Sequence, residues 1–375
     1  MITLIADDNL SFLKGVLEPF ANMIYLPGDR ITRKDALNAD GLIIRTRTRC
    51  DASLLEGTSV RFIATATIGY DQIDTDYCDK EGIRWFNAPG CNAAAVGQYI
   101  ASSLVQLAIR HDFKLSNKVI GIVGVGHTGR EVLKVARAFD MRVLMNDPPR
   151  QRVEGLKEFV NLKELADKAD FISFHVPLNN TGIDKTLHLV DDTFISSLKK
   201  RPLLINASRG EVATTAALKK GLSNGNIAGA ILDVWENEPA IDLGLLNLVD
   251  IGTAHIAGHS IDGKANGTIV CVREASKFFG FGIDDWSPGS LPLPESPVIT
   301  IQTEGKSREE ILNEAILKSY DIREDDVLLR QNPEQFELLR NNYHIRRDFN
   351  AFTVRLIPEN PEFSKTLKNL GFKVE

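Results

Sequence analysis

The stretch that most constrains the fold of this chain lies between residues 118 and 147. An apolar run at 119–123 leads into three glycines with the spacing GxGxxG, then into a helical apolar pattern and a second apolar run at 141–145. Short apolar runs of this kind are typical of strands buried on both faces of a parallel sheet. The order of strand, glycine turn, helix and strand therefore predicts a βαβ unit that binds a dinucleotide.

The three glycines are expected to have separate tasks. Gly124 permits the tight turn, Gly126 lacks the side chain that would keep a pyrophosphate from the backbone, and Gly129 lets the helix pack closely on the strand. His127 and Thr128 are expected to face the phosphates through their backbone, because free N–H groups at a helix N-terminus favour anions. A purely structural glycine turn is the alternative, and the surrounding pattern favours binding.

An acidic residue follows the second strand. Asp147 lies 18 residues beyond Gly129, where a carboxylate can accept hydrogen bonds from the ribose hydroxyls of the adenosine. Its negative charge would repel the additional phosphate of NADP. NAD is therefore the predicted cofactor.

Length and composition narrow the class of protein. A chain of 375 residues with 43% hydrophobic content can bury sizeable cores and predicts two or three domains. The net charge of −6 without a basic block argues against nucleic acid as a partner. The absence of any run near about 18 apolar residues argues against a membrane. The early acids argue against a signal peptide, and four scattered cysteines without CxxC predict reduced thiols in a cytoplasmic protein.

Strands and helices alternate before the glycine turn, which predicts an α/β domain with a parallel sheet. This domain is expected to end near a turn cluster at 87–90, and a long helix at 93–110 is expected to lead into the nucleotide-binding domain. The expected strands are 2–6, 22–26, 41–45, 61–66 and 84–86, and the expected helices are 11–20, 33–37 and 73–80.

Four more apolar runs follow the opening βαβ unit, at 170–176, 202–206, 227–233 and 248–253. With the first two strands they give six, the number expected of a doubly wound dinucleotide domain. The sequence at 161–164 resembles a capping box at a helix start.

Three polar residues stand after successive strands of this domain. Arg209, Glu238 and His255 offer a cation for a carboxylate, an acid that orients a base, and a base for a hydroxyl proton. A lone histidine is more often structural, and a lone glutamate before proline is more often a solvated turn residue. Together, beside NAD at the carboxyl edge of a sheet, the three predict hydride transfer from a 2-hydroxy acid.

The rest of the chain is predicted to lack catalytic motifs. A helix at 261–279 is expected to return to the first domain, and a proline-rich linker follows at 286–297. A small α+β domain is expected beyond it, with strands at 298–303 and 352–357 and helical stretches at 309–318, 333–341 and 361–370.

The motifs VGVGHTG, HVPL, NASRGE, DVWENEP and TAHIAGHS together closely resemble the D-isomer-specific 2-hydroxyacid dehydrogenases. The segments RTRT at 45–48 and TATIGYDQID at 65–74, with the C-terminal region, make the chain most similar to members that oxidise 4-phospho-D-erythronate to 2-oxo-3-hydroxy-4-phosphobutanoate in pyridoxal 5′-phosphate biosynthesis. The resemblance implies a flavodoxin-like substrate domain (1–92 and 260–285), a Rossmann NAD domain (93–259) and a small α+β C-terminal domain (290–375) that makes a homodimer.

The resemblance also implies roles for individual residues. The catalytic arginine, glutamate and histidine of the family fall on Arg209, Glu238 and His255. Cofactor contacts fall on the glycine turn and on Asp147, His175, Val176, Pro177, Ala207, Asp233 and Gly258. Substrate contacts fall on Thr46 and Thr67.

One position departs from the family pattern. The family often has a tyrosine after HIAG that reaches the substrate, whereas this chain has His259, which is shorter and titratable. Arg45 and Arg47 flank Thr46, and either a bond to the substrate phosphate or a surface ion pair suits them equally well. Metal binding by His255 and His259 is disfavoured because no helix or further ligand joins them.

Two other features have a preferred and a less favoured interpretation. Three arginines around Tyr343, at 340–347, are expected to form a dimer interface or a solvated face more readily than an anion or nucleic-acid patch. Cys91 is expected to be a packed thiol.

Two other functions stay open at the level of sequence. The chain can be another D-2-hydroxyacid dehydrogenase, acting for example on 3-phosphoglycerate or glyoxylate, or a non-catalytic NAD-sensing dimeric scaffold. The intact set of Arg209, Glu238 and His255 argues against a scaffold, because a pure binder needs no acid and base together.

Overall fold

The computed structural model describes residues 1–155 and 158–375. It divides into two compact units, a first unit of residues 1–92 with 260–292 and a second unit of residues 93–259 with 293–375. Along the described ranges, no helix has the length and apolar character needed to cross a membrane.

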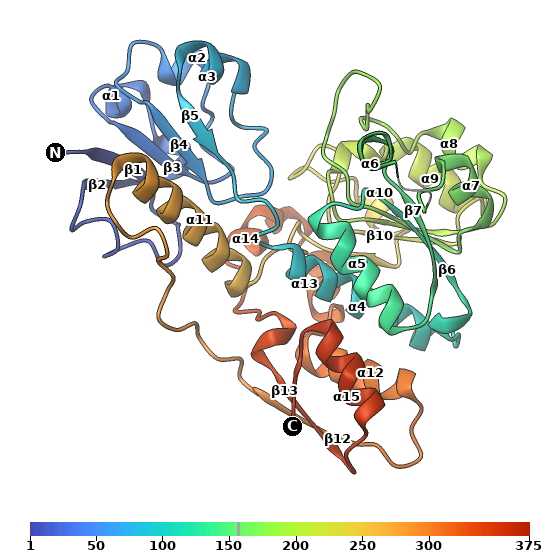
Figure 1. Ribbon diagram of the computed structural model, residues 1–375. Helices are drawn as coiled ribbons and strands as arrows, with labels where there is room; N and C mark the ends of the chain where they lie inside the picture. The colour runs from blue at the N-terminus through green and yellow to red at the C-terminus, as the bar shows by residue number, and fades with distance from the viewer. Residues whose placement is uncertain (156–157) are drawn as a thin grey trace. The chain divides into compact units, whose positions relative to one another are not determined.

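The first unit, all of whose residues are described, is built on a parallel five-stranded sheet (Figure 1). The strand order β2-β1-β3-β4-β5 is the flavodoxin-like order, so the predicted fold class is confirmed. The strands are β1 (Thr3–Asp7), β2 (Asn22–Leu26), β3 (Gly41–Ile44), β4 (Phe62–Thr65) and β5 (Arg84–Phe86).

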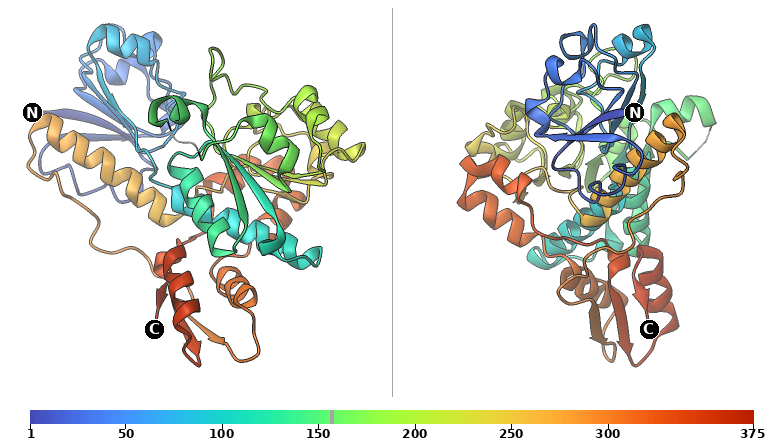
Figure 2. Two further views of the ribbon diagram at one scale, coloured as in Figure 1. Left: turned by 45° about the vertical axis from the view of Figure 1, so that its right-hand side comes forward. Right: turned by 90° about the vertical axis from the view of Figure 1, so that its left-hand side faces the viewer.

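Helices cover both faces of this sheet. On one face, α1 (Arg33–Ala36), α2 (Ala52–Leu55) and α3 (Thr75–Glu81) pack on side chains such as Ile5 and Ile63. On the other face, α11 (Ile261–Phe279) packs on β4, against side chains such as Leu4 and Phe62. Figure 2 shows this helix lying along the sheet. Because both faces are covered, β3 and β4 are buried at every residue.

The helix predicted at 11–20 is wrong, since these residues form turns. Phe12 and Gly15 have φ angles of 65° and 85°, which a right-handed helix cannot contain. Leu13 and Leu17 are nonetheless fully buried against the sheet. Their helical spacing therefore reflects two turns that each send one leucine into the core.

The second unit contains a parallel sheet that has six strands over its described residues, in the order β11-β10-β9-β8-β6-β7. The predicted strands are confirmed as β6 (Val119–Val123), β7 (Arg142–Asn146), β8 (Phe171–Phe174), β9 (Leu203–Asn206), β10 (Gly229–Leu232) and a short β11 (Ile251–Gly252). A single bridge also pairs Phe159 with Met145. The chain reverses direction across the sheet between β6 and β8, and ligands bind at the carboxyl ends of strands at such a switch point.

Two groups of helices enclose this sheet (Figure 1). The first group, α4 (Ala93–Arg110) and α5 (His127–Ala138), shares a core with Ile120 and Ile122 of β6. The second group packs around Ile172 and Leu204. It comprises α7 (Leu162–Lys168), α8 (Asp192–Ser197), α9 (Thr215–Ser223) and α10 (Leu243–Leu246), while α6 (Pro148–Glu154) follows β7. Asn161 caps α7 by accepting a bond from Glu164 N, as the capping pattern predicts.

The C-terminal part of the second unit adds a small parallel sheet of β12 (Val298–Gln302), β13 (Thr353–Ile357) and β14 (Lys373–Val374). Two helices from this part pack on the nucleotide-binding part, α12 (Arg308–Ser319) on α4 and α15 (Pro361–Leu370) on α5. The remaining helices are α13 (Arg323–Gln331), which packs beside β11, and α14 (Phe336–Asn341). The 3₁₀ turns are η1 (Gly28–Arg30), η2 (Leu115–Asn117), η3 (Gly210–Val212), η4 (Pro333–Gln335) and η5 (Phe349–Ala351).

Candidate active site

The glycine turn between β6 and α5 leaves no room for two of its side chains. Gly124 has a φ angle of 84°, and a Cβ on it would lie 2.4 Å from the carbonyl oxygen of His175. A Cβ on Gly129 would lie 2.1 Å from the carbonyl oxygen of Gly124. Both glycines are therefore required by the packing of the protein itself.

Gly126 differs from these two glycines. A Cβ on Gly126 would meet no described atom within 4 Å, so the packing of the protein does not explain its lack of a side chain. Gly126 is also the N-cap residue of α5, and no side chain caps this helix. Open space in front of uncapped N–H groups fits a pyrophosphate, so the turn has the geometry needed to hold NAD.

Asp147 stands at the end of β7 beside this turn. Its carboxylate accepts hydrogen bonds from Val125 N at 2.8 Å and from Arg150 N at 3.1 Å. A carboxylate has about four acceptor positions, so both oxygens can still accept from ribose hydroxyls. Arg150 was not foreseen from the sequence, and its guanidinium donates to Val125 O at 2.7 Å and pairs with Glu154.

His175 lies under the glycine turn at the end of β8. Its Nε2 shares a hydrogen bond of 2.7 Å with Ser173 Oγ, while its buried Nδ1 has no partner among the described residues. Burial lowers the pKa of His175 to about 3, so the ring is neutral near pH 7. Val176 also contacts the turn, since its Cγ1 would lie 2.9 Å from a Cβ on Gly124. An unpartnered polar atom beside the turn is a second feature that fits a bound cofactor.

His255 and Glu238 form a close pair at the carboxyl edge of the same sheet. His255 Nδ1 lies 2.5 Å from Glu238 Oε1, so Nε2 is the ring nitrogen that remains to exchange a proton with a ligand. Burial raises the pKa of Glu238, but its hydrogen bond to His255 and the charges of His255 and Arg340 outweigh burial and lower it overall. Glu238 is therefore ionised beside the imidazole.

The loop that carries His255 has a strained backbone. His255 has a φ angle of 55°, and a non-glycine residue in this region costs of order 1–3 kcal/mol unless its surroundings hold it there. The carboxylate of Asp233, which is only 1% exposed, accepts bonds of 2.7 Å from Ile256 N and 2.9 Å from Ala257 N. Asp233 thus fixes the two residues that follow the histidine.

Arg209 follows β9, the strand next to β10. Its Nη1 donates to Ser208 O at 2.8 Å. A Cβ on the adjacent Gly210 would lie 2.0 Å from Trp235 O, so the loop after β9 packs directly on the loop that carries Glu238. Because β9, β10 and β11 are neighbours in the sheet, the predicted arginine, glutamate and histidine stand on one edge of it.

The remaining predicted residues of the second unit lie on the same loops. Ala207 directly follows β9, and Pro177 follows Val176 after β8. Gly258 and His259 end the histidine loop, where His259 N donates to Ile256 O at 2.7 Å. The ring of His259 meets the ring of Tyr343 edge-on at 6.2 Å.

Three of the predicted substrate contacts belong to the first unit, at the carboxyl ends of β3 and β4, whereas His259 belongs to the second unit. Thr67 Oγ1 donates to Gly69 O at 2.7 Å. Arg45 Nη1 donates to Asn9 O at 3.4 Å, while Thr46 lies next to Arg45 and is exposed. Burial raises the pKa of Asp7 at the end of β1, although its bond from Asn9 N and the charge of Arg45 oppose this. These strand ends carry both a cation and hydroxyl groups.

A dimer interface or a solvated face was expected at 340–347, and the solvated face is wrong for two of the arginines. Arg346 and Arg347 are 3% and 8% exposed. The expectation followed the rule that charged residues are seldom buried, and the sequence does not show that the distant Tyr320 joins the nearby Tyr343 beside Arg346. Cys91 is buried, and burial raises its pKa to about 12, which confirms the packed thiol.

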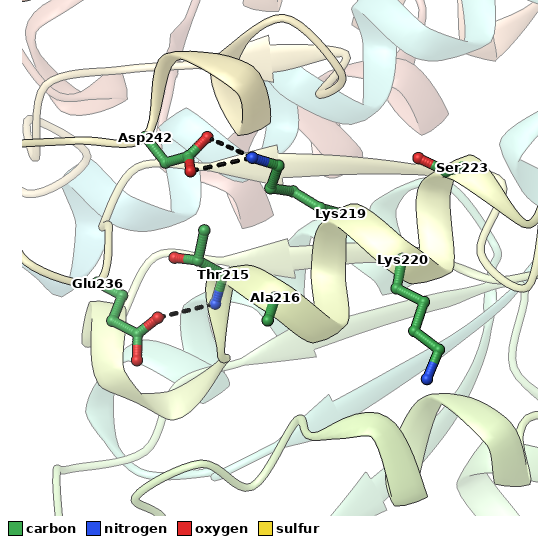
Figure 3. A pocket seen from close by; sticks show the side chains of 7 residues that line it. All are labelled: Thr215, Ala216, Lys219, Lys220, Ser223, Glu236 and Asp242. Carbon is green, nitrogen blue, oxygen red and sulfur yellow. Dashed lines mark hydrogen bonds and ion pairs between the residues drawn. The ribbon is translucent and has the colours of Figure 1, made fainter.

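A separate hollow lies beside α9 (Figure 3). Its charged side chains have partners within the protein, since Lys219 pairs with Asp242, Lys220 with Asp192, and Glu236 with Thr215 N. None of the predicted site residues lines it. In the described ranges, no group of three or more histidine, cysteine, aspartate or glutamate residues is placed to hold a metal ion.

Comparison with known proteins decides the family. Residues 98–257 match the NAD-binding domain of the D-isomer-specific 2-hydroxyacid dehydrogenases, and residues 292–371 match a domain of unknown function. Erythronate-4-phosphate dehydrogenase of Bacteroides thetaiotaomicron is 48% identical, over 94% of this chain and 98% of the relative. The enzyme of the same name from Porphyromonas gingivalis is 42% identical, over 98% of this chain and 99% of the relative. This chain belongs to the erythronate-4-phosphate dehydrogenase family.

Solved structures agree with this assignment at the level of the fold. D-lactate dehydrogenase from Aquifex aeolicus, complexed with NAD and lactic acid, has a TM-score of 0.62 and 23% identity, over 77% of this chain and all of that one. A glyoxylate reductase from Paecilomyes thermophila has a TM-score of 0.63 and 22% identity, over 75% of this chain and 96% of that one. This chain thus shares its fold with these two dehydrogenases over about three quarters of its length.

Proposed function

We propose that this chain oxidises 4-phospho-D-erythronate to 2-oxo-3-hydroxy-4-phosphobutanoate with NAD, as a step of pyridoxal 5′-phosphate biosynthesis in the cytoplasm. The names of its relatives support the substrate. The observation that carries the chemistry is the 2.5 Å pair of His255 and Glu238, on the same sheet edge as the glycine turn.

Each residue of the proposed catalytic set has one task. NAD, when bound, accepts the hydride from C2 of the substrate. His255 takes the proton of the C2 hydroxyl on Nε2, and a positioned general base contributes about 10²–10⁴ in rate. Glu238 fixes the tautomer of His255 and stabilises the charge that the ring gains. Arg209 binds the C1 carboxylate with its planar fork.

The cofactor is proposed to lie along the loops that follow the strands of the second unit. Gly124, Gly126 and Gly129 form the turn, His127 and Thr128 offer backbone N–H groups, and Asp147 accepts from the ribose. The residues proposed to line the rest of the cofactor are His175, Val176, Pro177, Ala207, Asp233 and Gly258.

Substrate recognition is proposed for residues of both units. Thr46, Thr67 and His259 are proposed to contact the substrate, and Arg45 is proposed to bind its terminal phosphate, because a guanidinium matches phosphate geometry. Residues 1–92 with 260–285 form the proposed substrate domain, 93–259 the NAD domain, and 290–375 a dimerisation domain. Light scattering on the purified protein is expected to give twice the 41.5 kDa of the chain.

A single assay tests the substrate. Purified protein is mixed with NAD and 4-phosphoerythronate, with a 2-oxo acid present to reoxidise the cofactor. Parallel reactions contain 3-phosphoglycerate or glycolate as the competing substrate. Turnover of phosphoerythronate alone supports the proposal. Turnover of a competitor in its place makes the chain another D-2-hydroxyacid dehydrogenase. NAD binding without turnover of any of them favours a scaffold.

A further inference from the structure

The C-terminal part of the second unit holds the catalytic histidine loop on both sides of His255. Before the histidine, Gly252 N donates to Asp326 Oδ1 of α13 at 2.7 Å. After the histidine, Arg346 Nη2 donates to Ala257 O at 2.5 Å. Two side chains from beyond the linker therefore bracket the residue proposed as the base.

Arg346 itself is held by a buried aromatic cluster. Its guanidinium lies over the ring of Tyr320 at 4.5 Å and over that of Tyr343 at 5.7 Å. Both tyrosine hydroxyls donate to Asp325 Oδ2, at 2.6 and 2.7 Å. The cluster fixes the guanidinium plane, because a cation is attracted to the face of an aromatic ring, and more strongly in a desolvated site.

The orientation of Arg346 depends on few contacts. Its Nε and Nη1 have no hydrogen-bond partner among the residues that the structure describes. The stacking on two rings and the bonds of Nη2, to Ala257 O and more weakly to Ala95 O at 3.4 Å, therefore determine where the guanidinium lies. A rigid donor aimed at a carbonyl two residues after His255 acts directly on the histidine loop.

The loop needs such support because its own strand gives little. The strand before it, β11, is an edge strand of only two residues, so few ladder bonds fix its direction. His255 nevertheless keeps a φ angle of 55°, which requires contacts on both sides. Asp233 supplies the contacts to the loop N–H groups, and Arg346 supplies the contact to a loop carbonyl.

We propose that Arg346 is a positioning residue that holds the His255 loop in its catalytic conformation. The C-terminal part is thereby a component of the active site in addition to its proposed part in dimerisation. The kinetic test of this inference rests on the proposed function, whereas the spectroscopic test does not.

The kinetic test compares Arg346→Met and Arg346→Lys with wild type. A small displacement of a catalytic group can cost about 10²-fold in rate, so we expect kcat to fall by about 30- to 100-fold in Arg346→Met, with the KM for NAD changed by less than about 2-fold. Lysine cannot stack on two rings and reach Ala257 O together, so Arg346→Lys is expected to lose about 10-fold. The matched control is Arg308→Met, which removes another arginine of the same part whose Nη2 donates to Ala138 O, and which should keep kcat within about 2-fold.

The spectroscopic test needs no substrate. The chain has 7 histidines, and carbon-13 labelling of their rings gives separate signals, of which His255 is identified by its loss in His255→Gln. In Arg346→Lys and Arg346→Met the His255 signal is expected to move while that of His127 stays. The Arg308→Met control should leave both signals in place.

The outcomes separate the two proposals. Wild-type kcat together with an unmoved His255 signal in Arg346→Lys overturns the positioning role, whether or not Arg346→Met folds. In another outcome, Arg346→Met lowers NAD affinity and the thermal midpoint only as much as Arg308→Met does, with kcat per folded molecule unchanged. That result would show that Arg346 has a purely structural role. If wild-type protein turns over no phosphoerythronate, the proposed function fails, and the His255 signal still decides the role of Arg346.

Discussion

The glycine turn and the histidine loop lie on the same edge of one sheet, yet different kinds of contact fix their conformations. The turn is fixed by contacts among residues of neighbouring loops, because a side chain on Gly124 or Gly129 would collide with nearby carbonyl oxygens. The histidine loop is held by Asp233 and Glu238 of the loop after β10 and by Arg346, which lies far along the chain. A cofactor site can thus be encoded by a short motif, whereas the position of the histidine proposed as the base depends on assembly of the whole unit.

The largest expected effect is a loss of turnover without a loss of NAD binding at the glycine turn. His255→Ala is expected to lower kcat by about 10³-fold, within the range for loss of a general base, while calorimetry finds NAD affinity changed by less than about 2-fold. Substantial residual turnover would remove His255 from its proposed role.

The second prediction separates two glycines of the turn. Gly124→Ala places a methyl group 2.4 Å from His175 O at a φ angle of 84°, so both NAD affinity and the free energy of unfolding should fall, the latter by at least about 1–3 kcal/mol. The methyl group of Gly126→Ala meets no described atom, so the thermal midpoint should stay near that of wild type. The same methyl group would occupy the space proposed for the pyrophosphate, so NAD binding should weaken by about 100-fold. Equal thermal midpoints in the two variants would contradict this distinction.

The third prediction concerns the acid of the pair. Glu238→Gln is expected to lower kcat about 10-fold or more and to move the acidic limb of the pH–kcat/KM profile to lower pH, because the protonated imidazole loses its counter-charge. Glu238 has a lowered pKa, so its stabilising contribution is present above the pKa of an unfolded glutamate and is lost as the pH falls through its folded value. The difference in unfolding free energy between wild type and variant should therefore shrink in that acidic window, and a profile that does not move would deny the coupling.

The smallest effect concerns cofactor choice. Asp147→Ser keeps a residue that can cap α6 but loses the charge, so NAD affinity should fall about 10-fold, as for loss of a charged hydrogen bond of about 1.5 kcal/mol, and the preference for NAD over NADP should shrink. Titration with both cofactors measures this. A preference equal to that of wild type would show that the charge of Asp147 does not select NAD.

The sequence predicted most elements whose apolar pattern is strong and local. The strands of both large sheets and the long helices α4 and α11 were found, because continuous apolar runs and glycine boundaries define them. The helix at 11–20 was wrong, since the backbone angle of Phe12 is not visible in a spacing of leucines. Helix α13 was missed because Leu329 and Asp325 are its only buried residues among those described.

The candidate site divides in the same way. Arg209, Glu238 and His255 could be selected as candidates because each lies in the loop that follows a strand, and the sheet order brings such loops to one edge. Asp147 was found as the acid at the end of the second strand. Arg346 was missed, because its own neighbourhood shows only Tyr343 and not that the distant Tyr320 and the carbonyl of Ala257 will also surround it.

The sequence by itself thus determined the glycine turn, the parallel sheets and the identity of the residues at the strand ends. These follow from sterics and apolar periodicity, which act between residues close in the chain. Only the tertiary structure decided that Glu238 meets His255 at 2.5 Å and that Arg346 reaches Ala257 across the domain. Such contacts join segments up to 89 residues apart, and their geometry exists only once both segments are packed on a shared core.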